Sequence, residues 1–95
     1  MNELIHQPTR LKIMATLNAM RGGVKFEFTE LRKLLGVTDG NLGTHLTTLE
    51  NAGYVEIEKA FVGKKPRTRV SLTRAGRRAF DIHVQYLRDI IHAAS

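Results

Sequence analysis

The sequence contains no cysteine. Disulfides, cysteine-based zinc sites and cysteine nucleophiles are therefore excluded, and a reducing compartment is permitted. Long apolar runs are also missing, so no segment is long enough to span a bilayer. The opening residues, Met1-Asn2-Glu3, do not have the basic start of a secretory signal. We therefore expect a cytoplasmic protein with no membrane partner.

The motifs of common enzyme classes are absent as well. There is no glycine-rich phosphate loop of Walker or Rossmann spacing and no HExxH metal motif. The serines are Ser71 and Ser95, and neither stands in a nucleophile-elbow context. We expect neither an enzyme nor a cofactor.

What the chain does contain is an ordinary globular composition. It has 95 residues, of which 42% are hydrophobic and 25% charged, far from the composition of disordered segments. A chain of this size buries only about two-thirds of its unfolded surface and cannot build two cores. The sequence predicts a single domain over residues 1–95.

Acidic residues are missing from one basic segment. Eight of the 15 lysines and arginines lie between Lys59 and Arg78, where there is no Asp or Glu. This concentration accounts for the net charge of +6. A local cluster of cations is the electrostatic footprint of a polyanion-binding site, although a solvated hairpin that aids solubility would have the same composition.

Three helices are expected in the first half of the chain. Apolar residues at helical spacing predict a helix from Pro8 to Met20, ended by Arg21-Gly22-Gly23, and a short strand over residues 24–28 follows. Thr29 is a suitable N-cap for a helix over residues 30–35. Three leucines of that helix are expected to face inward: Leu31, Leu34 and Leu35.

A helix-turn-helix is expected next. Gly36 ends the second helix, and Thr38 or Asp39 can cap a third helix that runs to about Ala52. That third helix has a core stripe of Leu42, Leu46 and Leu49. Helix 1 and the helix-turn-helix therefore occupy residues 8–53.

The second half has strand-like alternation followed by a long helix. Residues 54–72 predict a β-hairpin, a basic wing, whose turn is Gly63-Lys64-Lys65-Pro66. Thr73 can cap a final helix from Arg74 to about Ala93. That helix is apolar on more than one face, which predicts a homodimer seam formed by Leu4, Ile5, Ile82, Tyr86 and Ile90. A compact fold that wraps both sides of the helix is the alternative.

The order of these parts predicts a function. The chain is mainly α with a small β-wing, in the order helix, strand, helix, helix, strand, strand, helix. This is a winged helix-turn-helix. The third helix fits the major groove of DNA, and the wing can reach a neighbouring minor groove or phosphate ridge.

Four stretches of the sequence resemble the winged-helix transcription regulators of bacteria and archaea, in particular short members related to the ArsR and MarR families: residues 38–46 (TDGNLGTHL), 49–55 (LENAGYV), 63–68 (GKKPRT) and 72–77 (LTRAGR). The likeness extends from Arg10 to about Leu87. The resemblance implies a dimeric repressor or activator that binds a pseudo-palindromic operator in double-stranded DNA.

The resemblance also implies which residues meet DNA. On the third helix these are Asp39, Gly40, Asn41, Thr44 and His45, and on the wing they are Lys64, Lys65, Arg67 and Arg69. Two further candidate DNA contacts come from the helix pattern itself: Thr38 at its start, and Thr48 on the face opposite the leucine stripe. Many relatives have an arginine where this chain has Thr44, and no Lys or Arg lies between Lys33 and Lys59. Bidentate guanine readout is therefore not expected. Asn41 contacting adenine, threonine methyls contacting thymine, and DNA shape are the better candidates.

Gly40 and Gly43 are unusual in a helix, where each costs about 1 kcal/mol relative to alanine. A close approach of the helix backbone, either to DNA or to the preceding helix, would explain them.

Histidines raise the possibility of a metal site. Asp81, His83 and His92 suggest a site on the last helix, but the two histidines are nine positions apart and no acidic or histidine ligand follows. A solvated or interface histidine is preferred, and no metal is expected.

Two other functions fit a winged helix. One is a protein-interaction module, which has no need of eight cations in one fifth of the chain. The other is a non-specific nucleic-acid-binding protein. An effector ligand is neither predicted nor excluded.

Overall fold

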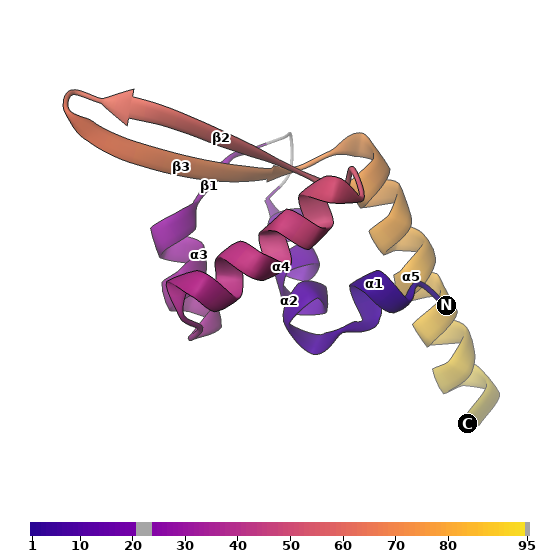
Figure 1. The fold of residues 1–95 in the computed structure, drawn as a ribbon. Coiled ribbons are helices and arrows are strands. Elements are labelled where there is room, and N and C mark those ends of the chain that lie inside the picture. The colour runs from indigo at the N-terminus through magenta and orange to yellow at the C-terminus, as the bar shows by residue number, and fades with distance from the viewer. Residues whose placement is uncertain (21–23, 95) are drawn as a thin grey trace.

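The computed structural model describes residues 1–20 and 24–94. The elements follow in the order α1 (Glu3–His6), α2 (Pro8–Ala19), β1 (Phe26–Glu27), α3 (Phe28–Leu35), α4 (Asp39–Asn51), β2 (Val55–Val62), β3 (Lys65–Leu72) and α5 (Arg74–Ala94). The hairpin β2–β3 and the end of α5 extend from the helical body in opposite directions (Figure 1). The predicted winged helix-turn-helix is confirmed, with one additional short helix, α1, at the N-terminus.

The sheet is antiparallel with strand order β1-β3-β2. The long hairpin pairs Val55 with Leu72 at its base and Val62 with Lys65 at its tip. The turn is therefore Gly63-Lys64, and Gly63 has a φ of 65°, as two-residue hairpin turns require. Pairing of β1 with β3 involves Phe26 and Val70, so only the base of the hairpin is attached to the body.

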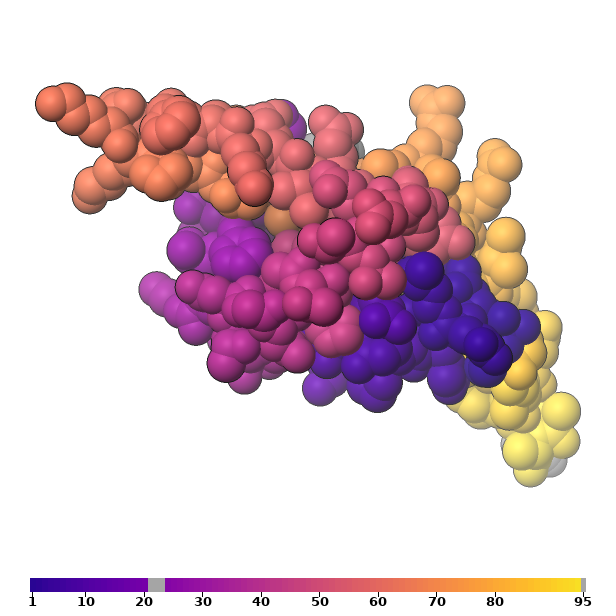
Figure 2. Space-filling view, in the orientation of Figure 1, coloured from indigo at the N-terminus to yellow at the C-terminus, as the bar shows by residue number. Residues whose placement is uncertain are grey.

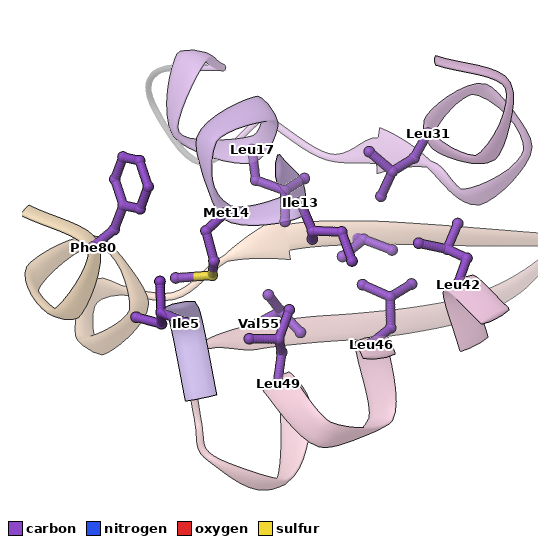
Figure 3. Close-up of a cluster of buried hydrophobic side chains, with 11 residues drawn as sticks. Ile5, Ile13, Met14, Leu17, Leu31, Leu42, Leu46, Leu49, Val55 and Phe80 are labelled. Carbon is purple, nitrogen blue, oxygen red and sulfur yellow. The ribbon is translucent and has the colours of Figure 1, made fainter. Parts of the chain in front are cut away.

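A single core joins the helices to the base of the sheet (Figure 3). Apolar side chains from α1, α2, α3, α4, both hairpin strands and α5 are buried in it: Ile5, Ile13, Met14, Leu17, Leu31, Leu42, Leu46, Leu49, Val55, Val70 and Phe80. The predicted leucine stripe of α4 is confirmed. Because α4 buries this face, its opposite face is exposed to solvent.

Local capping fixes where α3 ends and where α4 and α5 begin. The Thr38 hydroxyl accepts a hydrogen bond from the backbone N–H of Asn41 at 3.1 Å, which makes Thr38 the cap of α4. Gly36, in the left-handed region with a φ of 66°, ends α3. The Thr73 hydroxyl accepts from the N–H of Gly76 at 2.9 Å and caps α5, as predicted.

Gly76 has a packing role that the sequence did not reveal. A Cβ at this position would lie 2.1 Å from the backbone oxygen of Tyr54. That oxygen already accepts a hydrogen bond from the N–H of Thr73 at 3.0 Å. The first turn of α5 therefore sits against the chain that leaves α4, at a distance that excludes any side chain.

Several local predictions were wrong. Helix α3 begins at Phe28, with Glu27 rather than Thr29 at its N-cap position. This is because Phe28 packs against the core and draws the first turn back toward the sheet. Leu34 does not face inward but is 64% exposed. The short strand is limited to Phe26–Glu27, and the predicted Arg21-Gly22-Gly23 helix end lies outside the described residues.

Ile5 is also misassigned. It was predicted to lie at a dimer seam, but it is completely buried in the core of the single chain. The unpredicted helix α1 explains this, because it packs against α2 and α5 and directs Ile5 inward. None of the helices in the described part of the chain is long and apolar enough to cross a membrane.

Candidate nucleic-acid interface

The exposed face of α4 has short polar side chains. Asn41 and Thr44 are exposed, and Thr48 is half-buried one turn after Thr44. Gly40 adds bare backbone beside them. Within α4 the acidic residues are Asp39 and Glu50, and there is no lysine or arginine. The helix can therefore offer hydrogen bonds and methyl groups to a ligand, but no cation.

The threonine hydroxyls of α4 are already used as donors. Thr44, Thr47 and Thr48 donate to the carbonyl oxygens of residues 40, 43 and 44 at 2.9, 2.9 and 3.2 Å. These bonds fix the side-chain rotamers. The threonines therefore offer methyl groups and oxygen lone pairs, which suit thymine methyls and the amino groups of adenine or cytosine.

The two glycines of α4 have no packing role within the described chain. A Cβ built at Gly40 or Gly43 would have no atom within 4 Å. A close approach to the preceding helix is therefore ruled out as the reason for these glycines. The other explanation, a close approach to DNA, stays a prediction.

The negative charge at the start of α4 is partly offset by an ion pair. Nε of Arg32, in α3, lies 2.9 Å from the Asp39 carboxylate. Arg32 was not among the predicted site residues. The pair lies where α3 turns into α4 and reduces the negative charge that the start of α4 presents.

His45 lies on the flank of α4, half-buried against α2. Its Nδ1 is 3.1 Å from Nη1 of Arg10, and Nε of Arg10 donates to the backbone oxygen of Leu4 at 2.6 Å. Burial, followed by the positive charge of Arg10, lowers the pKa of His45. Both effects favour the neutral form of the His45 ring. Sequence reasoning missed Arg10, which is 35 positions away in the chain.

The cations of the wing fall into two groups. Lys64 and Lys65 lie at the exposed tip, where no ion pair involving either is found within the described residues. Nearer the body, Nε of Arg67 is 3.3 Å from the Glu27 carboxylate. Arg69 is paired with Glu58, which also pairs with Lys25.

These pairs alter the charge that the wing presents. Lys25 and then Arg69 lower the pKa of Glu58, so this carboxylate stays ionised. Arg69 is half-buried, and its Nε has no hydrogen-bond partner among the described atoms. The predicted site residues Arg67 and Arg69 are thus partly neutralised by acids from outside the basic segment.

The wing stands out from the body as an arm (Figure 2). Phe61, opposite Pro66 near the tip, is 75% exposed. The structure shows that no part of the described body covers it.

His83 is buried rather than solvated. It is 1% exposed, its Nε2 lies 3.3 Å from Nδ1 of His6, and its ring stacks on Tyr86. Burial, then the positive potential of His6 and the N-terminus, lowers the pKa of His83. Among the described residues, no group of three or more histidines and carboxylates could hold a metal ion.

The proposed dimer residues of α5 form an exposed apolar row. Ile82, Tyr86 and Ile90 are all exposed, and Ile91 beside them is exposed too. Ile82 and Tyr86 line a hollow that also includes Met1 and Tyr54. Leu4 is half-buried and packs against the core. A surface of this kind is unusual for a monomer.

Helix-turn-helix, wing and polar recognition face together define the winged-helix class. Residues 9–91 match the winged helix DNA-binding domain family. The chain belongs to that family.

Two proteins are similar to this chain over most of their length. An uncharacterized protein of Methanocaldococcus jannaschii is 35% identical over 83 residues, which are 86% of each chain. A structure described as a transcriptional regulator homologue, from Pyrococcus horikoshii OT3, is 31% identical, with a TM-score of 0.89 over 99% of this chain and 90% of that one.

Two further solved structures share the fold of this chain. A MarR-family regulator of Enterococcus faecalis V583 is 25% identical, with a TM-score of 0.73 over 95% of this chain and 77% of that one. A homodimeric winged helix-turn-helix domain of Mycobacterium bovis, a possible ArsR-family regulator, is 18% identical, with a TM-score of 0.71 over 98% and 79%. The predicted resemblance to winged-helix regulators is confirmed.

Proposed function

We propose that this protein is a homodimeric transcriptional regulator that binds specific sites in double-stranded DNA. Helix α4 lies in the major groove, and the wing contacts the phosphate backbone or the adjacent minor groove. The observation that carries the proposal is the pairing of an exposed, hydrogen-bonding helix face with a cationic arm in one small domain. Membership of a DNA-binding family supports it.

The two elements have different tasks in this proposal. Asn41 can make a bidentate contact with adenine, and the methyls of Thr44 and Thr48 can contact thymine. Thr38 and Gly40 contribute at the start of the helix, where backbone N–H groups favour phosphate. Lys64 and Lys65 supply most of the sequence-independent attraction, and Arg67 and Arg69 add to it if DNA displaces their acid partners.

The homodimer rests on the apolar row of α5. Ile82, Tyr86 and Ile90 are the contacts we propose, with Leu4 at the edge. The Mycobacterium bovis neighbour is described as homodimeric. A symmetric pair of α4 helices would read two half-sites about 10 base pairs apart, centre to centre.

Selection of bound fragments from random duplex DNA, at a stated salt concentration, tests the proposal. We expect enrichment of pseudo-palindromic sites that the protein prefers over mixed-sequence duplex. Equal binding to every duplex would favour the non-specific alternative, and no binding at any moderate salt concentration would favour a protein-interaction module.

The dimer is tested separately by sedimentation. Ile82→Glu should give a monomer because it places a charge in the seam. Leu34→Glu is the matched control, since Leu34 is 64% exposed and Ile82 is 65% exposed. If both variants stay dimeric, α5 is not the interface.

A further inference from the structure

Arg10 and His45 form a contact between the helical body and the recognition helix. Arg10 is near the start of α2, and His45 is on α4, one turn after Asn41 and next to Thr44. Their atoms Nη1 and Nδ1 are 3.1 Å apart. Arg10 is itself anchored by its Nε bond to the Leu4 carbonyl.

This contact fixes the position of the proton on the His45 ring. A guanidinium has five N–H donors and no acceptor, so Nδ1 of His45 must accept. A neutral imidazole that accepts at Nδ1 has its proton at Nε2. Among the described residues no partner is found for Nε2, and that atom is not one of the buried unpartnered ones. Its N–H is therefore available to a ligand.

We infer that Arg10 is a positioning residue that holds His45 as a hydrogen-bond donor to a DNA phosphate oxygen at the flank of the major groove. The inference rests on the proposed function. A phosphate is favoured over a base because His45 lies at the edge of the exposed face of α4 rather than at its centre. The nearby Arg10 cation also favours an anionic acceptor, and about half or more of protein–DNA hydrogen bonds go to the backbone.

Two matched substitutions at His45 test the contact by binding to a duplex obtained from the selection above. His45→Leu removes the donor and should weaken binding by about tenfold or more, the usual loss for a hydrogen bond to a charged group. His45→Gln keeps an acceptor for Arg10 and a donor for DNA, and should retain most of the affinity. Equal losses in both variants would overturn the inference.

A double-mutant cycle tests whether Arg10 acts through His45. Arg10→Met should weaken binding, Arg10→Lys should restore part of it, and Arg10→Met combined with His45→Leu should cost no more than the larger single loss. Additive losses would mean that Arg10 contacts DNA directly, which contradicts the positioning role. The His45 pair of variants leaves the Arg10 bond to Leu4 intact, so the inference stays testable if Arg10→Met does not fold.

The salt dependence of binding gives an independent readout. A neutral donor releases no counterion, so His45→Leu should leave the salt slope unchanged; a fall of about 0.9 would instead indicate a cationic contact.

Nitrogen NMR of the free protein decides the proton position without DNA. The spectrum should show a proton on Nε2 of His45, and a proton on Nδ1 would overturn the inference. Failure of the wild-type protein to bind any duplex would overturn the proposed function. Wild-type binding that His45→Leu leaves unchanged would overturn only the inference.

Discussion

Helix α4 and the wing differ in the charge that they expose. Helix α4 has no basic residue, and its N-terminal carboxylate is paired with Arg32. The wing has its unpaired cations at the tip, where Lys64 and Lys65 are exposed. Hydrogen bonds from α4 depend on the bases they meet, whereas the charge of the wing does not. We therefore propose that specificity and general affinity are located in separate elements.

The largest expected effect comes from removing the cations at the wing tip. Lys64→Ala combined with Lys65→Ala should weaken binding to all duplexes alike and reduce the salt slope by up to about 1.8, since each phosphate contact contributes about 0.9. Titrations at several salt concentrations measure this. Arg67→Ala is the control and should have a smaller effect, because Glu27 already pairs with it in the free protein. Equal effects would remove the distinction between tip and base.

The next effect should appear in specificity. Asn41→Ala should lower discrimination at one base pair by about 1–3 kcal/mol, the value of a bidentate contact, and should leave binding to mixed-sequence duplex nearly unchanged. Asn51→Ala is the matched control, because Asn51 is an exposed asparagine at the other end of α4. A uniform loss on all sequences would show that α4 contributes general affinity after all.

A third substitution removes the acidic partner of two cations at the base of the wing. Glu58→Gln should free Arg69 and Lys25 and so strengthen binding to mixed-sequence duplex, with a salt slope steeper by at most about 0.9 per new contact. Glu56→Gln makes the same change of charge on the same strand, at a residue for which no ion pair is found in the described part of the chain. If both variants behave alike, the pairing at the base of the wing does not restrain Arg69.

The smallest effect concerns acidity and the helical body. Burial lowers the pKa of both His45 and His83, whereas residues 54–72 contain no histidine. The unfolded chain therefore takes up protons more readily than the folded one as the pH falls below the ordinary histidine pKa of 6.5. Stability should be greatest above that pH and should decline between it and the lowered folded values.

Denaturant unfolding at several pH values between about 7.5 and 5 measures this dependence. His83→Gln should reduce it, and His83→Gln combined with His45→Gln should flatten it, because both histidines contribute. A dependence that survives undiminished in the double variant would assign it to other groups.

Local patterns predicted most of the fold. The leucine spacing of α4, the caps Thr38 and Thr73, and the alternation of the hairpin strands depend on neighbours within a few positions, which a sequence displays directly. Predictions failed where a distant contact decided the outcome. Phe28 packs against the core and moves the start of α3, and the short helix α1 takes Ile5 into the core. Neither contact has a local signature.

The candidate site divides in the same way. The sequence by itself determined the polar face of α4 and the concentration of cations between Lys59 and Arg78, because both are properties of continuous segments. Only the tertiary structure decided which charges stay unpaired. Glu27 and Glu58 reach Arg67 and Arg69, Arg32 reaches Asp39, and Arg10 reaches His45. Each of these contacts forms only when the sheet and the helices are packed together, because the two partners come from different elements of the fold.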